Sequence, residues 1–149
     1  MQLCRNRPVG MIFSPFLLMT TKKILIIDDE TDFSSLLKTY FEKRSCEVII
    51  ANSIESGMDA METFRPDYLF LDNNLPDGLG WAKTEYILTN YPFCQLNLIS
   101  GHLVPKTSAM NFRIIEKPLS FSDLDNILQN EPFAWKSENG GRVGYSKKM

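Results

Sequence analysis

The stretch KILIIDDE, residues 23–30, contains the strongest single indication of the fold. Its first part, Lys23–Ile27, is a continuous aliphatic run, which is typical of a β-strand that is buried on both faces. The run ends in two adjacent acids, Asp28 and Asp29. A strand buried on both faces belongs to a sheet that helices cover on both sides. The stretch therefore predicts an α/β domain with acidic side chains at the end of its first strand.

The rest of the chain repeats this alternation of helix and strand. Apolar side chains next recur at the spacing of an amphipathic helix, and these are Phe33, Leu36, Leu37, Tyr40 and Phe41. Four more strands are expected at Glu47–Ala51, Tyr68–Leu71, Gln95–Ile99 and Arg113–Ile115. Three more helices are expected: one that Ser53 caps and Pro66 stops, one at Trp81–Asn90, and one capped by Ser122 or Asp123. This order predicts a doubly wound, five-stranded parallel sheet with helices on both faces.

Length and composition fit one globular domain and exclude a disordered chain, a fibrous repeat and a disulfide scaffold. The 149 residues are 44% hydrophobic and 23% charged, which are ordinary values for a folded domain. Sixteen basic and eighteen acidic residues give a net charge of −2, so no basic surface for direct nucleic-acid binding is expected. Cys4, Cys46 and Cys94 are not in CxxC spacing, and free thiols fit a reducing, cytoplasmic location.

Three segments are expected along the chain. Residues 22–130 form the domain, residues 1–21 a disordered N-terminal extension, and residues 131–149 a flexible C-terminal tail. No apolar stretch reaches the roughly 18 residues that span a bilayer, and no cleavage site follows the apolar run near the N-terminus, so no membrane partner is expected. Candidate translation starts are Met1, Met11 and Met19.

Polar residues stand at or just beyond the ends of four predicted strands. They are Asp28 and Asp29 after the first strand, Asp72 after the third, Ser100 after the fourth and Lys117 after the fifth. Doubly wound sheets bind ligands beyond the carboxyl ends of their strands, so these side chains are expected at one edge. Two carboxylates about 5 Å apart repel by roughly 1 to 3 kcal/mol. A hard divalent cation such as Mg²⁺, which prefers oxygen ligands, would offset that repulsion.

Four short motifs, in this order, resemble the receiver domain of two-component response regulators. They are KILIIDDE at 23–30, DNNLPDGLG at 72–80, ISG at 99–101 and EKPL at 116–119. The resemblance covers residues 22–130 and implies a flavodoxin-like receiver fold with Mg²⁺ as cofactor. It implies a phosphoacceptor that receives its phosphoryl group from a sensor histidine kinase or a histidine phosphotransfer protein. It further implies no separate enzymatic turnover. A stand-alone receiver is expected to signal to a downstream protein by contact or to pass its phosphoryl group onward, and a phosphorylation-dependent homodimer is also expected.

The resemblance assigns a role to each polar residue at the strand ends. Asp72 would be the phosphoacceptor, Ser100 would hydrogen-bond the phosphoryl group, and Lys117 would pair with it. Mg²⁺ would be held by Asp29 directly, by Asp28 mainly through water, by Asp72 and by the backbone carbonyl of Asn74. These roles agree with the chemistry of the residues, because phosphoryl transfer is catalysed by positioning and by neutralising charge.

Two departures from the family pattern affect the expected switch. Receivers usually carry Tyr or Phe three residues before the lysine of the fifth strand, where this chain has Ile114. Ser100 and Lys117 are only 17 residues apart, which predicts a fourth helix that is short or missing. These departures leave open an alternative function, a receiver-like interaction module that acts independently of phosphorylation.

Other classes of protein lack their defining residues here. Haloacid-dehalogenase-like phosphatases need Asp-x-Asp after the first strand, and Asp28-Asp29-Glu30 does not supply it. Neither a GxGxxG sequence nor a P-loop is present, which argues against a nucleotide site. Only 19 residues follow Asn130, too few for an effector domain, so a single-domain, stand-alone receiver is expected.

Overall fold

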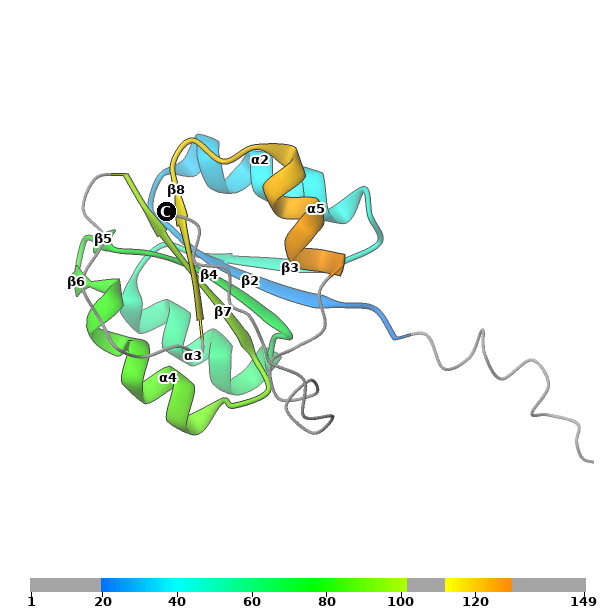
Figure 1. Ribbon diagram of the computed structural model, residues 1–149. Coiled ribbons are helices and arrows are strands. Elements are labelled where there is room, and N and C mark those ends of the chain that lie inside the picture. The colour runs from blue at the N-terminus through cyan, green and yellow to red at the C-terminus, as the bar shows by residue number, and fades with distance from the viewer. Residues whose placement is uncertain (1–19, 102–111, 130–149) are drawn as a thin grey trace, which may run out of the picture.

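A five-stranded parallel β-sheet lies at the centre of the chain (Figure 1). The structure is a computed structural model, and it describes residues 20–101 and 112–129. The strands of the sheet are β2 (Lys23–Ile27), β3 (Glu47–Ala51), β4 (Tyr68–Asp72), β7 (Gln95–Ser100) and β8 (Phe112–Glu116). Their spatial order is β3-β2-β4-β7-β8, and every neighbouring pair is parallel. The prediction of a doubly wound sheet is confirmed, and its strand order is that of flavodoxin-like folds.

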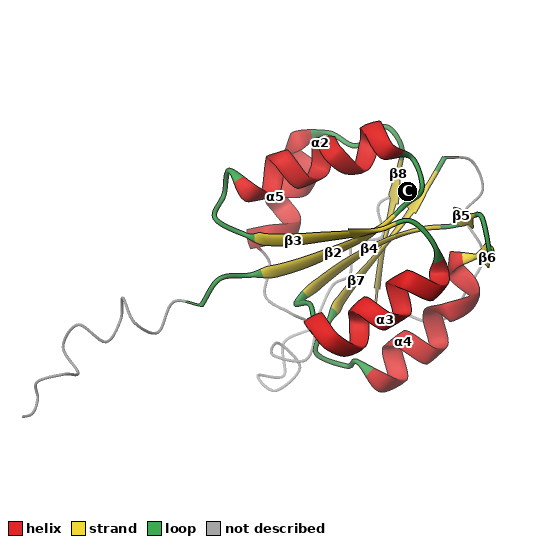
Figure 2. Cartoon of the chain, turned by 180° about the vertical axis from the view of Figure 1, so that it is seen from behind, coloured by secondary structure: helices red, strands yellow, loops and turns green. Residues whose placement is uncertain are grey.

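Helices cover both faces of the sheet (Figures 1 and 2). They are α2 (Thr31–Glu42), α3 (Ile54–Phe64), α4 (Thr84–Asn90) and α5 (Phe121–Gln129), with a short 3₁₀ helix, η2 (Gly80–Lys83), before α4. α2 and α5 pack on one face of the sheet, whereas α3 and α4 pack on the other. Within residues 20–101 and 112–129, no helix has the length and apolar character needed to cross a membrane.

β2 lies between the two hydrophobic cores and contributes to both. Ile24 and Ile26 belong to the core under α2 and α5, whereas Leu25 and Ile27 belong to the core over α3 and α4. All four side chains are at most 1% exposed. The uninterrupted aliphatic sequence of this strand follows from its burial on both faces.

Several element boundaries differ from those predicted. β4 and β7 each extend one residue further, so that Asp72 and Ser100 belong to strands, and β8 is one residue longer at each end. The helix expected at Trp81–Asn90 is divided into η2 and α4. Leu36, expected on the apolar face of α2, is 54% exposed because it lies beside the buried stripe of that helix.

One of the two predicted helix caps is confirmed and the other is wrong. The Ser53 hydroxyl accepts the backbone N–H of Ser56 at the start of α3. At the start of α5 the capping side chain belongs to Ser120, not to Ser122 or Asp123. The Ser120 hydroxyl accepts the N–H of Asp123, and the Asp123 carboxylate accepts the N–H of Ser120, both at 3.1 Å. This reciprocal arrangement is a capping box, so the acid lies in the first turn of the helix.

The turn-rich stretch after β4 folds into a small antiparallel hairpin of β5 (Asn74–Leu75) and β6 (Gly78–Leu79). Gly80 follows the hairpin, and its N–H donates to the carbonyl of Asn73 at 2.8 Å. A Cβ at Gly80 would overlap the backbone carbonyl oxygen of Asp72. Glycine is therefore needed for the hairpin to return close to the end of β4.

A long-range contact ties this hairpin to α3. The carboxylate of Asp77 accepts the backbone N–H groups of Ile54 at 2.8 Å and of Glu55 at 2.9 Å. These N–H groups belong to the first turn of α3 and have no partner within the helix itself. Asp77 thus fixes the hairpin to a helix that precedes it by more than twenty residues in the sequence.

Predictions for three segments lie outside the described residues. They concern the N-terminal extension up to residue 19, the fourth helix at 102–111 and the C-terminal tail from residue 130.

Candidate functional site

An open pocket of about 410 Å³ lies at the carboxyl edge of the sheet. It is beside β2 and β4, between which the strand order reverses, and this is where doubly wound sheets bind ligands. The pocket is lined by Asp28, Asp29, Glu30, Asp72, Asn74, Gly101 and Lys117. The structure therefore brings together five of the six predicted site residues, and the sixth, Ser100, is the direct neighbour of Gly101.

Three carboxylates form the acidic side of the pocket. One oxygen each from Asp28, Asp29 and Asp72 lie within 4.8 Å of one another. Asp28 is 1% exposed and Asp72 is 7% exposed, whereas Asp29 is exposed. At this separation two carboxylates repel by about 1 kcal/mol in water and about 3.5 kcal/mol at an effective dielectric of about 20. Hard oxygen ligands this close together could hold a hard divalent cation.

Burial raises the pKa values of the two buried acids. For Asp28, desolvation raises the pKa, and a hydrogen bond from the backbone of Glu30 and the charge of Lys117 oppose it. For Asp72, desolvation raises the pKa most, and the negative charge of Asp28 raises it further. The charge of Lys117 and hydrogen bonds from the backbone of the two following residues lower the pKa of Asp72, but by less. The pocket thus disfavours its own negative charge, and a bound cation would relieve that cost.

Lys117 supplies the positive charge of the pocket. Its backbone N–H donates to the carbonyl of Ser100 at 2.8 Å, which holds the residue beside the end of β7, and its peptide bond to Pro118 is cis. Its Nζ lies 3.3 Å from Asp28 Oδ2 and 3.6 Å from Asp72 Oδ1. Burial lowers its pKa, but the hydrogen bond to Glu30 and the three neighbouring carboxylates together raise the pKa above its ordinary value. Lys117 therefore stays protonated at neutral pH.

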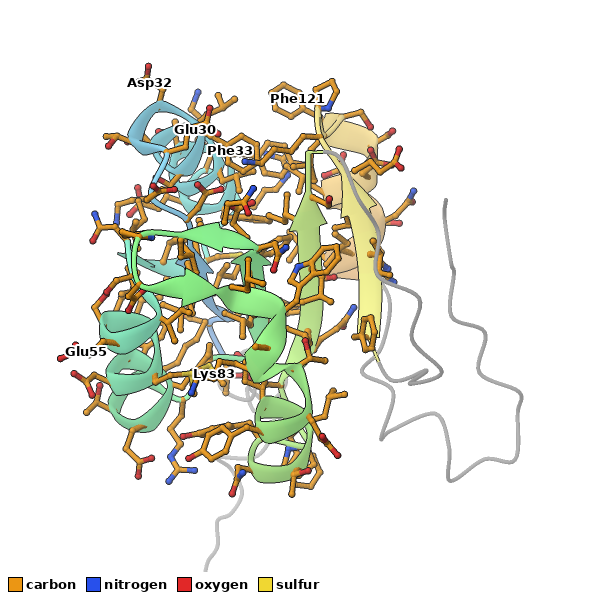
Figure 3. All side chains as sticks on the ribbon, turned by 90° about the vertical axis from the view of Figure 1, so that its left-hand side faces the viewer. Glu30, Asp32, Phe33, Glu55, Lys83 and Phe121 are labelled. Atoms are coloured by element: carbon orange, nitrogen blue, oxygen red, sulfur yellow. The ribbon has the colours of Figure 1, made fainter. Side chains whose placement is uncertain are left out.

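Two further described residues contact Lys117, and the sequence predicted neither of them as part of the site. Nζ donates to Glu30 Oε1 at 3.0 Å and lies 4.5 Å from the centre of the Phe33 ring. Both residues lie at the beginning of α2, as Figure 3 shows. Glu30 is part of the same acidic stretch as Asp28 and Asp29, and this proximity in sequence was the one available indication of its role.

Ser100 and Gly101 complete the far side of the pocket. Ser100 is the last residue of β7, is 4% exposed and pairs in register with Glu116 of β8. A Cβ built on Gly101 would meet no heavy atom of the described residues within 4 Å. Within residues 20–101 and 112–129, nothing blocks the access of an incoming group to this strand end.

Ile114 occupies the position where receivers usually carry an aromatic side chain. It is half-buried and packs against the core on the α3 and α4 side of the sheet. Its aliphatic side chain cannot take the place of the aromatic ring that the family pattern expects there.

Comparisons with known proteins identify the family and the fold of the chain. A family model described as "Response regulator receiver domain" matches residues 24–129. The transcriptional regulatory protein YxdJ of Bacillus subtilis is 30% identical over 103 residues, which are 66% of this chain and 45% of that protein. The photosynthetic apparatus regulatory protein RegA of Rhodobacter capsulatus is 24% identical over 112 residues, which are 72% of this chain and 61% of that protein. The chain thus spans about half the length of these relatives.

Solved structures give the same fold. A CheY-like response regulator receiver domain from Methylobacillus flagellatus is 27% identical, with a TM-score of 0.65, and the match covers 74% of this chain and 98% of that one. A CheY-like receiver domain protein from Methanospirillum hungatei is 24% identical, with a TM-score of 0.68, and the match covers 82% of this chain and 100% of that one. The second likeness supports the fold alone.

Proposed function

The chain belongs to the response regulator receiver domain family, and we propose that it accepts a phosphoryl group on Asp72 from a sensor histidine kinase or a histidine phosphotransfer protein. The observation that carries this proposal is the convergence of charges in one pocket. The buried Asp72 carboxylate lies within 4.8 Å of two other acids and 3.6 Å from the Lys117 ammonium. Such a site suits a group that is itself anionic and needs both a nucleophile and neutralising charge.

The carboxylates support Mg²⁺ as the cofactor. Asp28, Asp29 and Asp72 offer oxygens within 4.8 Å of one another, and Asn74, whose backbone carbonyl we assign as the fourth ligand, lines the same pocket. Oxygen ligands of this kind fit Mg²⁺, which typically binds one or two carboxylates and keeps several waters. When bound, Mg²⁺ neutralises charge on the transferred phosphoryl oxygens.

Asp72 acts as the nucleophile of the transfer. One carboxylate oxygen attacks the phosphorus of the phosphohistidine, the P–N bond breaks with its electron pair returning to the imidazole nitrogen, and an acyl phosphate forms on Asp72. Lys117 offsets negative charge on the phosphoryl oxygens, and the Ser100 hydroxyl donates a hydrogen bond to one of them. Gly101 has no side chain, and no other described residue crowds it, so the imidazole can approach Asp72 past this position.

We propose that the phosphorylated protein signals by contact with a downstream protein, in the cytoplasm, and that phosphorylation promotes a homodimer. Phosphorylation replaces the single negative charge of Asp72 by about two, so the pocket becomes about one unit more negative. The hairpin that follows Asp72 is anchored to α3 through Asp77, so a rearrangement of the hairpin would reach the surface of that helix. Such a charge change is sufficient to bias a loop or helix between two arrangements.

Intact-mass measurement tests the proposal. The protein is incubated with Mg²⁺ and acetyl phosphate, or with a phosphorylated histidine kinase, in parallel with Asp72→Asn and with the Mg²⁺ replaced by EDTA. We expect the mass of one phosphoryl group to be added to the wild type alone and only with Mg²⁺. An unchanged gain in Asp72→Asn, or no gain in the wild type with either donor, would contradict the proposal. Sizing chromatography of the same samples tests dimer formation.

A second candidate function is an interaction module that works without phosphate, and Ile114 favours it because the usual aromatic switch residue is absent. If the chain acts in this way, a captured partner protein should bind equally well to Asp72→Asn and to the wild type treated with phosphoryl donor. A partner whose affinity changes on phosphorylation excludes this second candidate.

A further inference from the structure

The ammonium of Lys117 lies on the α2 side of the pocket. Its Nζ is closest to Glu30 Oε1 at 3.0 Å, then to Asp28 Oδ2 at 3.3 Å, and is furthest from Asp72 Oδ1 at 3.6 Å. The Phe33 ring lies on the same side, with its centre 4.5 Å from Nζ. The lysine is thus held between a carboxylate and an aromatic ring that do not belong to the acidic cluster.

The backbone of Glu30 is fixed, so its side chain is well placed to hold the lysine. Its N–H donates to Asp28 Oδ1 at 2.8 Å, and its carbonyl accepts both the N–H and the hydroxyl of Ser34 at 3.0 Å. Only the side chain, which is 60% exposed, extends over the pocket toward Lys117. Glu30 is therefore anchored at the beginning of α2 by contacts that do not depend on the lysine.

We propose that Glu30 is a positioning residue that competes with the incoming phosphoryl group for Lys117. In the unphosphorylated protein Glu30 and Phe33 keep the ammonium on the α2 side. When Asp72 is phosphorylated, Lys117 exchanges Glu30 for a phosphoryl oxygen. This inference rests on the proposed function of Asp72, and it assigns to Glu30 the control of how fast the site accepts phosphate.

The substitution Glu30→Gln tests the competition, because it removes the negative charge and keeps the size of the side chain. With acetyl phosphate the Asp72 oxygen attacks phosphorus, acetate leaves with the electron pair of the broken P–O bond, and no proton is required. At saturating Mg²⁺ we expect the initial rate of phosphorylation to rise by about two- to fivefold, the range that corresponds to one partly exposed ion pair. An unchanged or lower rate overturns the proposal.

Glu55→Gln is the matched control. Glu55 is an exposed acid at the beginning of α3, and Figure 3 shows it far from Glu30. We expect its rate to equal that of the wild type. An equal rise in both variants would show that overall charge, and not the contact with Lys117, controls the rate.

The effect must depend on Lys117. In a Lys117→Met background we expect Glu30→Gln to leave the rate unchanged, since no ammonium remains for which to compete. A rise that persists in this background would mean that Glu30 acts by repelling the anionic donor, and the proposal would fail.

A measurement without phosphorylation completes the test. In EDTA, the shifts in urea midpoint of Glu30→Gln and Lys117→Met should not add in the double variant, because both single substitutions remove the same ion pair. Additive shifts would overturn the inference. A wild type that fails to gain phosphate contradicts the proposed function instead, whereas a phosphorylated wild type with no response to Glu30→Gln contradicts this inference alone.

Discussion

The substitution Asp72→Asn should make the metal-free protein more stable, although it removes the proposed phosphoacceptor. In the wild type the Asp72 carboxylate is repelled by Asp28 and Asp29, whose oxygens lie within 4.8 Å, and attracted by Lys117 at 3.6 Å. At effective dielectrics between about 20 and about 80, each repulsion is about 1 to 3.5 kcal/mol and the attraction is only slightly larger. The attraction thus cancels one repulsion and leaves the other, together with the cost of desolvating Asp72.

We therefore expect Asp72→Asn to raise the free energy of unfolding in EDTA at pH 7.5 by about 1 to 3 kcal/mol, measured by urea denaturation. Asp59→Asn, which removes an exposed acid from α3, controls for the change in net charge and should change stability little. A destabilised Asp72→Asn protein, or an equal gain in Asp59→Asn, would refute the electrostatic reasoning.

The difference in stability between the wild type and Asp72→Asn should also change with pH and with Mg²⁺. The pKa of Asp72 is raised in the folded state, so this carboxylate is protonated at a higher pH in the folded wild type than in the unfolded chain. Lowering the pH through that raised pKa therefore stabilises the wild type relative to Asp72→Asn, and the difference narrows. Mg²⁺ at about 100 times its Kd should stabilise the wild type by about 2.7 kcal/mol and the variant by less. A difference that stays constant in acid and in Mg²⁺ would contradict the reasoning.

Four further substitutions test individual residues of the hairpin and the pocket. Asp77→Asn should lower the urea midpoint at pH 7, and this loss should disappear in acid. Backbone hydrogen bonds lower the pKa of Asp77 in the folded state. The stabilisation by Asp77 is therefore present above the unfolded-state pKa and is lost as the pH falls through the folded-state pKa. Gly80→Ala should destabilise the protein by about 1 to 3 kcal/mol in urea denaturation and slow phosphorylation, because the new Cβ would push against the carbonyl of Asp72. Asp29→Asn should weaken Mg²⁺ binding by about tenfold in calorimetry, equivalent to about 1.4 kcal/mol, whereas Lys117→Met should bind Mg²⁺ at least as tightly as the wild type because it removes a positive charge.

Much of the fold could be predicted because it follows from local sequence patterns. The aliphatic run of β2 requires burial on both faces, and the structure places its alternate residues in two cores. Once the sheet is parallel, its topology brings the residues at the strand ends to one edge. The sequence therefore predicts that Asp28, Asp72 and Lys117 lie together, and their roles are the subject of the proposal above.

The features that were missed depend on contacts between distant segments. Asp77 binds the start of α3 across a separation of 23 residues in the sequence, and Glu30 binds Lys117 across 87. No periodicity or spacing encodes either pair. The cap of α5 was misplaced for a different reason, because Ser120, Ser122 and Asp123 are all competent capping residues within four positions, and the choice among them depends on where the chain turns after β8.

The charges of the pocket explain why the position of Lys117 matters for the proposed reaction. The described residues that line the pocket include four carboxylates and one ammonium. Their excess of three negative charges would fall to one with a bound divalent cation. Forming the acyl phosphate replaces the single charge of Asp72 by about two, so the excess grows again just where the buried Asp28 is already desolvated. Among the described residues that line the pocket, Lys117 is the one cation, and it can move toward the new charge. The Glu30 side chain is 60% exposed, so water can solvate its carboxylate when the lysine moves away. Breaking the Lys117–Glu30 ion pair therefore costs less than leaving the phosphoryl oxygens without a neutralising partner.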